Sequence, residues 1–130
     1  YTDLSSFKLY MSDVGILTMK SGLPHHIILS GEGNTFLGAL MENYVASQLK
    51  ANGYDLYYWT SEYSAELDFV IVKDQRVYAI EVKKGEHVRS KSLSQFASKY
   101  HPYRAIRFSM KNFGNENDIW SIPLYAVFCL

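Results

Sequence analysis

Apolar residues recur at three- and four-residue spacing in two stretches of the chain, and each stretch predicts a helix. In the first they are Leu37, Leu40, Met41, Tyr44, Val45 and Leu49. Asn34 or Thr35 can cap its start, and Gly53 lies where a glycine C-cap is expected. In the second they are Leu93, Phe96, Ala97 and Tyr100, after a start at Ser90 or Ser92 and before a stop at Pro102.

Strands are predicted at residues 55–59, 66–73, 76–83 and 103–109, with a closing strand at 124–129 after a polar loop. Ahead of the first long helix we expect a short strand at 7–11, a helix from Ser12 to Met19 stopped by Gly22, and an extended connection at 25–30. The core order is helix, three strands, helix, strand. This order predicts an α/β fold with a central mixed sheet flanked by helices.

The two central strands form a hairpin if Asp74-Gln75 is a two-residue turn. In that register Asp68 is opposite Glu81 and Glu66 is opposite Lys83, and alternation places all four side chains on one face. Both faces are otherwise apolar, so the hairpin is expected in the interior. Because Asp74-Gln75 is not a favoured turn pair, a shifted register is the alternative.

Two opposed, sheltered carboxylates repel each other, and a divalent cation would remove that conflict. Oxygen ligands suit Mg²⁺ or Mn²⁺, and Lys83 could offset negative charge during a reaction. The alternative is that Glu81 and Lys83 form a solvated strand edge. Glu42 lies on the flank of the first long helix, where it is either solvated or functional.

Lys+Arg and Asp+Glu both number 13, so a basic field over the whole domain is excluded and any nucleic-acid contact must be local. The one basic cluster consists of Lys83, Lys84, His87, Arg89 and Lys91. It could meet phosphates beside the acidic residues, or be a solvated loop and helix start. The run Tyr57-Tyr58-Trp59 could stack bases, although a packed strand is the simpler interpretation.

The chain has one cysteine, Cys129, in an apolar run where it is expected to be core. A single cysteine cannot form an internal disulfide, which fits a reducing, cytoplasmic location. No apolar stretch approaches the roughly 20 residues of a membrane span. We therefore expect no membrane association.

Glu42 on a helix, Asp68 on a strand and Glu81-Val82-Lys83 on the next strand resemble the PD-(D/E)xK nuclease superfamily, as does the αβββαβ order. Five segments resemble, more closely, an uncharacterised domain (domain of unknown function 4143) that follows the ATPase module of bacterial and archaeal AAA-type ATPases. These segments are residues 8–17, 38–45, 66–69, 81–85 and 122–125.

The resemblance implies a restriction-endonuclease-like core and a role for each matching residue. Asp68 and Glu81 would ligate Mg²⁺ or Mn²⁺ together with the Val82 carbonyl, Lys83 would position or activate the attacking water, and Glu42 would assist. Residues 34–130 would be the nuclease-like domain. Residues 1–33 would be a strand, a short helix and a connection from an ATPase region upstream. That region is not in this sequence, since it has no G-x-x-x-x-G-K-[ST] motif.

Two functions remain open at this point. One is an enzyme that hydrolyses phosphodiester bonds, in DNA by expectation, with Lys84, His87, Arg89 and Lys91 contacting the nucleic acid. The other is a weakly active or inactive module that binds nucleic acid or protein and is coupled to the ATPase. Fold alone does not choose between them.

Overall fold

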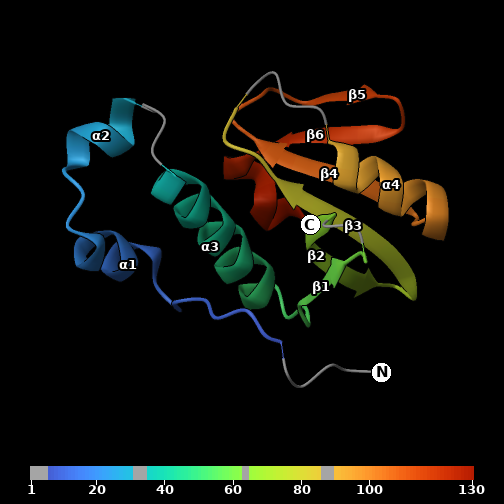
Figure 1. The fold of residues 1–130 in the computed structure, drawn as a ribbon, viewed down its shortest axis with the longest axis horizontal. Coiled ribbons are helices and arrows are strands. Elements are labelled where there is room, and N and C mark those ends of the chain that lie inside the picture. The colour runs from blue at the N-terminus through green and yellow to red at the C-terminus, as the bar shows by residue number, and fades with distance from the viewer. Residues whose placement is uncertain (1–5, 31–34, 63–64, 86–89) are drawn as a thin grey trace.

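A computed structural model describes residues 6–30, 35–62, 65–85 and 90–130. Its centre is a six-stranded mixed sheet in the order β1-β2-β3-β4-β6-β5 (Figure 1). The strands are β1 (Tyr57–Thr60), β2 (Glu66–Lys73), β3 (Arg76–Val82), β4 (Arg104–Ser109), β5 (Gly114–Glu116) and β6 (Ile119–Pro123). The pairs β3–β4 and β4–β6 are parallel, and the others are antiparallel. The expected mixed α/β sheet flanked by helices is confirmed.

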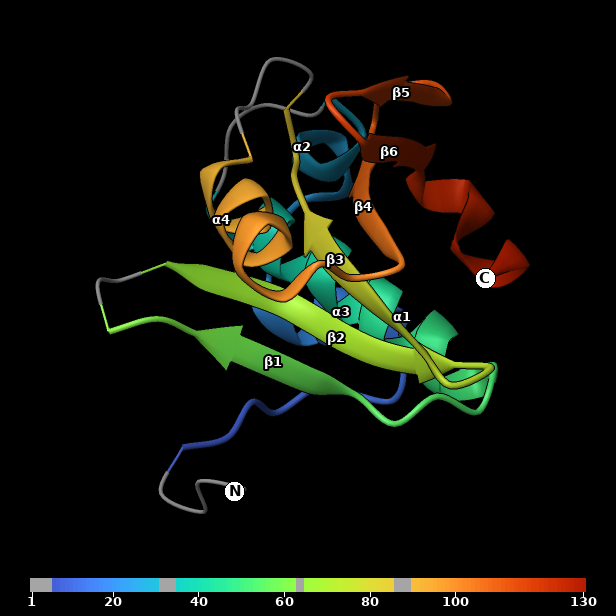
Figure 2. The same cartoon turned by 90° about the vertical axis from the view of Figure 1, so that its right-hand side faces the viewer.

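Helices lie on both sides of this sheet. They are α1 (Val14–Ser21), α2 (His25–Ser30), α3 (Thr35–Ala51), α4 (Lys91–Tyr100) and the short 3₁₀ helix η1 (Leu124–Cys129). Figure 2 shows α3 behind the long strands and α4 in front of them, with α1 beside α3. The order α3-β1-β2-β3-α4-β4 is the one expected from the sequence.

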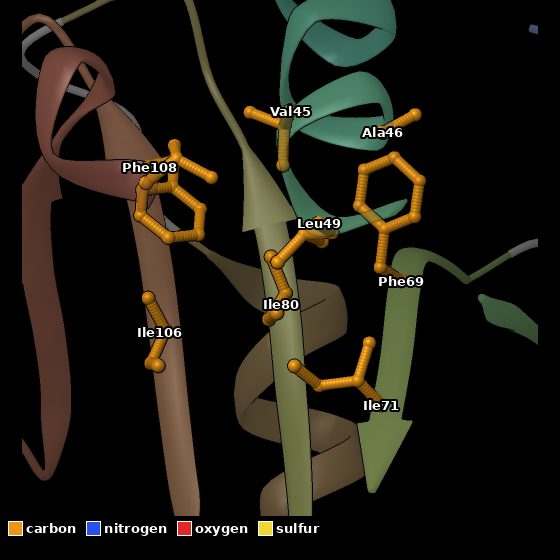
Figure 3. Packing of buried hydrophobic residues seen from close by; sticks show 9 residues of the cluster. Val45, Ala46, Leu49, Phe69, Ile71, Ile80, Ile106 and Phe108 are labelled. Atoms are coloured by element: carbon orange, nitrogen blue, oxygen red, sulfur yellow. The ribbon is translucent and has the colours of Figure 1, made fainter. Parts of the chain in front are cut away.

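Two apolar clusters hold the helices to the sheet. Beneath α3, Val45, Ala46 and Leu49 pack with residues of β2, β3, β4 and η1 (Figure 3). The strands contribute Phe69, Ile71, Ile80, Ile106 and Phe108 to this cluster, and η1 contributes Val127. Beneath α4, Leu93 and Phe96 pack on Leu67, Ala79, Ala105 and Ile119. A side chain can therefore be assigned to the α3 face or the α4 face by the cluster that it joins.

The central hairpin has the expected turn and register. Lys73 pairs with Arg76 and Phe69 with Ile80, so Asp74 and Gln75 form a two-residue turn. Both turn residues have positive φ, 49° and 62°, as a type I′ turn requires. The C-cap of α3 is also confirmed: Gly53, at φ 87°, donates to the Lys50 carbonyl, and Tyr54 donates to the Leu49 carbonyl. These two bonds form a Schellman motif.

The structure corrects several expectations near the two ends of the chain. Residues 7–11 form no strand, Asp13 rather than Ser12 caps α1, and residues 25–30 are the helix α2. The closing strand is Ile119–Pro123, paired through a tight turn with β5, and 124–129 is helical instead. Cys129 is exposed rather than core.

Two expectations fall on residues that are not described: a cap at Asn34 and the domain boundary between residues 33 and 34. Within the described ranges, every helix is too short or too polar to cross a membrane.

Candidate acidic site

A β-bulge in β2 determines where the acidic side chains point. Tyr57 pairs with Val70, but Trp59 pairs with Leu67, so β2 contains one more residue than β1 between these two pairs. The extra residue lies at Asp68-Phe69. As a result Leu67 packs under α4 while Phe69 packs under α3, although strict alternation would place them together. The bulge leaves Asp68 on the α3 face as well, beside Glu42 and Lys8.

Asp68 lies where the β2–β3 ladder ends. The last backbone pair is Phe69–Ile80, and beyond it the Val82 amide donates to Asp68 Oδ2 at 2.7 Å. The Asp68 side chain is only 18% exposed. Burial raises its pKa to about 6, with Glu42 adding to the rise and the Val82 amide, Lys8 and Lys83 opposing it. Asp68 therefore carries its charge at neutral pH in a place that disfavours it.

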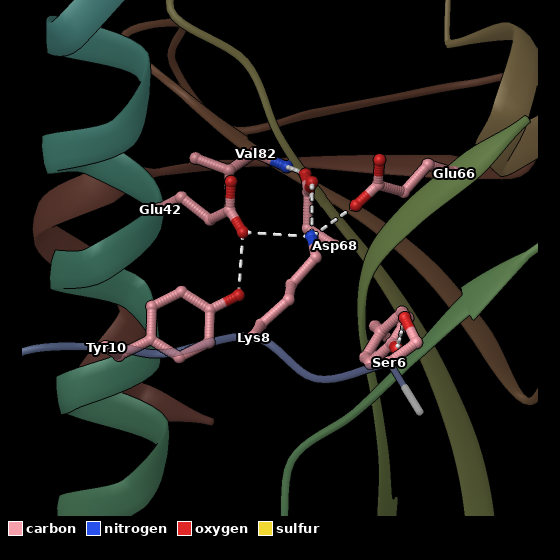
Figure 4. Close-up of polar contacts among 8 residues, drawn as sticks. Ser6, Lys8, Tyr10, Glu42, Glu66, Asp68 and Val82 are labelled. Atoms are coloured by element: carbon pink, nitrogen blue, oxygen red, sulfur yellow. Dashed lines mark hydrogen bonds and ion pairs between the residues drawn. The ribbon is translucent and has the colours of Figure 1, made fainter. Parts of the chain in front are cut away.

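Lys8 is the cation at the centre of the carboxylates on this face (Figure 4). Its Nζ lies 3.1 Å from Glu42 Oε1, 2.5 Å from Glu66 Oε1 and 4.0 Å from Asp68 Oδ1. Burial disfavours its charge, but the contacts with Glu66 and Glu42 outweigh burial and raise the pKa of its ammonium. One positive charge is thus held among three carboxylates that come from α3 and β2.

Residues 6–12, which we call the N-terminal strap, bring Lys8 to this position. Tyr10 donates its hydroxyl to Glu42 Oε1 at 2.7 Å, and its ring packs against Phe69 with centroids 5.6 Å apart. The buried Asn43 side chain accepts from the Met11 amide and donates to the Met11 carbonyl. The strap is therefore attached to α3 at consecutive points next to the acidic residues.

Glu81 and Lys83 form a second group on the other face. Ile80 and Val82 pack under α3 and Ala79 under α4, so alternation directs Glu81 to the α4 face. Glu81 is 2% exposed, and its Oε1 lies 3.1 Å from Lys83 Nζ. The expectation that Asp68 and Glu81 face each other on one side of the hairpin is wrong, because the bulge turns Asp68 to the α3 face. The same holds for Glu66 and Lys83, whose partners are Lys8 and Glu81 instead.

The two groups nevertheless meet at one end of the hairpin. The peptide that joins Glu81 to Val82 provides the amide that Asp68 binds, and Lys83 is close enough to lower the pKa of Asp68. Glu42, Asp68, Glu81 and Lys83 therefore lie around the end of the β2–β3 ladder, with the Glu81 and Asp68 carboxylates on opposite faces.

The donor chemistry here fits a hard divalent cation. Three carboxylates already surround a positive charge, and the buried Glu81 Oε2 has no hydrogen-bond partner among the described residues. In its present arrangement, that part of the chain has no group of three or more His, Cys, Asp or Glu side chains placed to hold a metal ion. Binding would therefore require the acidic side chains to move closer together, and the Lys8 ammonium that lies among three of them to leave.

The remaining predicted residues lie at the surface or outside the described ranges. Lys84 and Lys91 are exposed, and His87 and Arg89 fall among residues that are not described. Trp59 packs edge-on against Phe96 and Tyr100, as expected for a packed strand, while Tyr57 is 56% exposed. Lys8 and Tyr10 are site residues that the hairpin argument missed, since neither is near it in sequence.

Comparison with known proteins places the chain in a family. The family described as Domain of unknown function (DUF4143) matches residues 37–127. The chain belongs to this family. The DUF4143 match includes Glu42, Asp68, Glu81 and Lys83, and it begins after the strap that carries Lys8 and Tyr10.

Two curated relatives share part of this DUF4143 chain. They are uncharacterized proteins of Mycobacterium bovis and Mycobacterium tuberculosis, each 37% identical to it over 79 residues. The matched part is 59% of this chain and 18% of each relative, so the chain spans well under a quarter of their length. No solved structure matches the chain.

The raised pKa of Asp68 predicts a pH-dependent difference in stability between wild type and Asp68→Asn. Between about pH 4 and pH 6 the folded state binds more protons at Asp68 than the unfolded state, so the stability that Asp68 contributes falls as pH rises. In EDTA, the free energy of unfolding of Asp68→Asn relative to that of wild type should rise by about 2–3 kcal/mol between pH 4 and pH 7.5. Urea denaturation at both pH values measures this, and an unchanged or reversed difference contradicts it.

Proposed function

We propose that this DUF4143 chain is a restriction-endonuclease-like domain that hydrolyses phosphodiester bonds, in DNA, with Mg²⁺ or Mn²⁺. The observation that carries the proposal is the partly buried Asp68 carboxylate at the end of the β2–β3 ladder, 2.7 Å from the Val82 amide and close enough to Glu42 for that charge to add to burial in raising its pKa. The element order α3-β1-β2-β3-α4-β4 supports the same superfamily. The parent protein would be an AAA-type ATPase whose ATPase region lies upstream.

Asp68 and the Val82 carbonyl would hold the cation, with Glu42 assisting from α3. Glu81 lies on the other face of the hairpin, so it would join these ligands only by reaching around the end of the β2–β3 ladder. When bound, the cation supplies a Lewis acid for phosphoryl oxygens and an acidified water. Lys83 would offset the negative charge that develops on the phosphate during attack. Glu81 Oε1 lies 3.1 Å from Lys83 Nζ, so this carboxylate keeps the ammonium at the end of β3.

Phosphate groups on either side of the scissile bond need cations outside the acidic site. Lys84 and Lys91 are exposed: Lys84 follows β3 and Lys91 begins α4, and His87 and Arg89 lie between them in the sequence. Contacts of this kind hold the nucleic-acid backbone without reading its sequence. We propose that these four residues bind the substrate.

A DNA-cleavage assay tests this function. Plasmid and single-stranded DNA are incubated with the domain in Mg²⁺, Mn²⁺ or EDTA, alongside Asp68→Asn. Cleavage by wild type with metal, at least 1,000-fold slower with Asp68→Asn or EDTA, is the expected result. Cleavage that persists at the wild-type rate in Asp68→Asn contradicts the proposal.

A second function is favoured by one observation, the Lys8 ammonium among Glu42, Glu66 and Asp68. A domain whose acidic site is already occupied by its own lysine could bind nucleic acid or protein and regulate the ATPase without cutting. DNA binding that is unchanged by Asp68→Asn, with no cleavage in any metal, is the result that supports this alternative.

A further inference from the structure

We propose that Lys8 is an internal competitor for the divalent cation, so that metal binds the acidic site only when the N-terminal strap is released. This inference rests on the proposed metal-dependent function and adds a control step to it. Lys8 now contacts Asp68 and Glu42, which would hold or face the cation, and also the neighbouring Glu66 carboxylate. The ammonium and the metal ion therefore compete for the same oxygens.

Simple electrostatics makes the two occupants exclusive. A unit charge and a divalent ion about 4 Å apart repel each other by roughly 8 kcal/mol at an effective dielectric of about 20. The Lys8 ammonium occupies the space between the Glu42, Glu66 and Asp68 carboxylates, 2.5–4.0 Å from one oxygen of each. A metal ion bound to these oxygens would take that space, so the ammonium has to leave it.

The strap can move without unfolding the domain. Phe7 and Leu9 are 72% and 85% exposed, so Tyr10, which packs against the α3 cluster, carries most of the apolar surface that separation of the strap would expose. Most of the strap's inward contacts are polar: Lys8 with the acids, Tyr10 with Glu42, Met11 with Asn43, and Ser6 with the Tyr58 hydroxyl. Its ring contacts are the Tyr10 ring on Phe69 and the Lys8 ammonium over the Tyr58 ring. Segments of this kind open locally at a small fraction of the global unfolding free energy.

The position of the strap in the chain suggests what would control it. Glu42, Glu66 and Asp68 lie within the DUF4143 match, whereas Lys8 precedes it. The inhibiting cation thus reaches the family's acidic residues from a segment outside the matched domain. Anything that draws the strap away from α3 would remove Lys8 from these carboxylates.

Titration with Mn²⁺ of wild type and Lys8→Met tests the proposal. Methionine keeps the length of the side chain and removes its charge, so Lys8→Met should bind one Mn²⁺ at least 10-fold more tightly than wild type. Lys50→Met is the matched control, because Lys50, like Lys8, forms an ion pair, but it lies at the end of α3 and its partner is the exposed Asp55. Its affinity for Mn²⁺ should equal that of wild type.

A second variant and a second measurement test the proposal even if Lys8→Met does not fold. Tyr10→Phe keeps the ring on Phe69 and removes only the hydroxyl contact with Glu42, so it should tighten Mn²⁺ binding by a smaller factor. In wild type, Mn²⁺ should speed hydrogen exchange of the Met11 amide, which Asn43 protects in the closed strap. Unchanged exchange under saturating metal would overturn the proposal.

The outcomes separate this inference from the proposed function. If Lys8→Met binds Mn²⁺ no more tightly than wild type while Asp68→Asn loses binding, Lys8 does not compete with the metal ion, but the proposed metal site at Asp68 is supported. If Lys8→Met shows no Mn²⁺ binding at all, both are wrong. Cleavage by wild type at full rate, with the Met11 amide still protected, overturns the competition alone.

Discussion

Phe69→Ala is expected to destabilise the domain by about 4 kcal/mol. Phe69 is 1% exposed at the bulge, where it packs against the α3 cluster and the Tyr10 ring. Removing the ring deletes buried apolar surface and leaves a cavity between α3 and the sheet. Because domains of this size are stable by about 5–15 kcal/mol, the loss is a large part of the total.

Urea denaturation in EDTA measures the Phe69 effect, with Phe128→Ala as the control. Phe128 lies on η1 and is 62% exposed, so its replacement should change the unfolding free energy by less than about 0.5 kcal/mol. A loss of under 1 kcal/mol in Phe69→Ala would show that the bulge does not place this ring in the core.

Lys83→Met is expected to slow DNA cleavage by about 100- to 1,000-fold while leaving Mn²⁺ affinity unchanged or tighter. Lys83 would act on charge that develops during the reaction, so its loss should lower kcat rather than binding. Its ammonium lies 3.1 Å from Glu81 Oε1, and removing it frees that carboxylate for the cation. Steady-state kinetics with a labelled oligonucleotide, together with Mn²⁺ titration, separate the two effects.

Lys50→Met is also the control for this experiment, because its ammonium pairs with Asp55 outside the candidate site. A proportional loss of cleavage and of metal binding in Lys83→Met would assign Lys83 a structural role in the site. Equal rates in Lys83→Met and wild type would remove Lys83 from the reaction.

The central part of the fold is predictable because its signals are local. Helical periodicity over residues 37–49 and the Gly53 cap identify α3, and two apolar strands around Asp74-Gln75 identify the hairpin. Alternation along β3 also places Ile80 and Glu81 on opposite faces as expected. These features depend on residues that are neighbours in sequence.

The bulge could not be predicted from β2 alone. Residues 66–73 read as one regular strand without glycine, and the extra residue becomes apparent only in the pairing with β1. The consequence for the site is large, since one inserted residue moves Asp68 to the face of Glu42 and separates it from Glu81. A register argument within one hairpin contains no information about the third strand.

Lys8 was missed for a related reason. It lies 34 residues from Glu42 in sequence, and its ion pairs depend on how the strap crosses α3. Residues 7–11 alternate like a strand, yet their polar atoms bind α3 side chains instead of a neighbouring strand. Similarly, the hairpin of β5 and β6 turns at Asn117-Asp118, two residues that tolerate positive φ, in a stretch that reads as polar loop.

Binding of Mn²⁺ to wild type and to Asp68→Asn, titrated side by side at pH 7.5, tests most directly whether the end of the central hairpin is a metal centre. One ion per chain is expected in wild type, with an affinity at least 30-fold weaker when the buried carboxylate becomes an amide. Equal affinity in the two proteins, or no binding to either of them or to Lys8→Met, would show that these acids serve only to hold the strap in place.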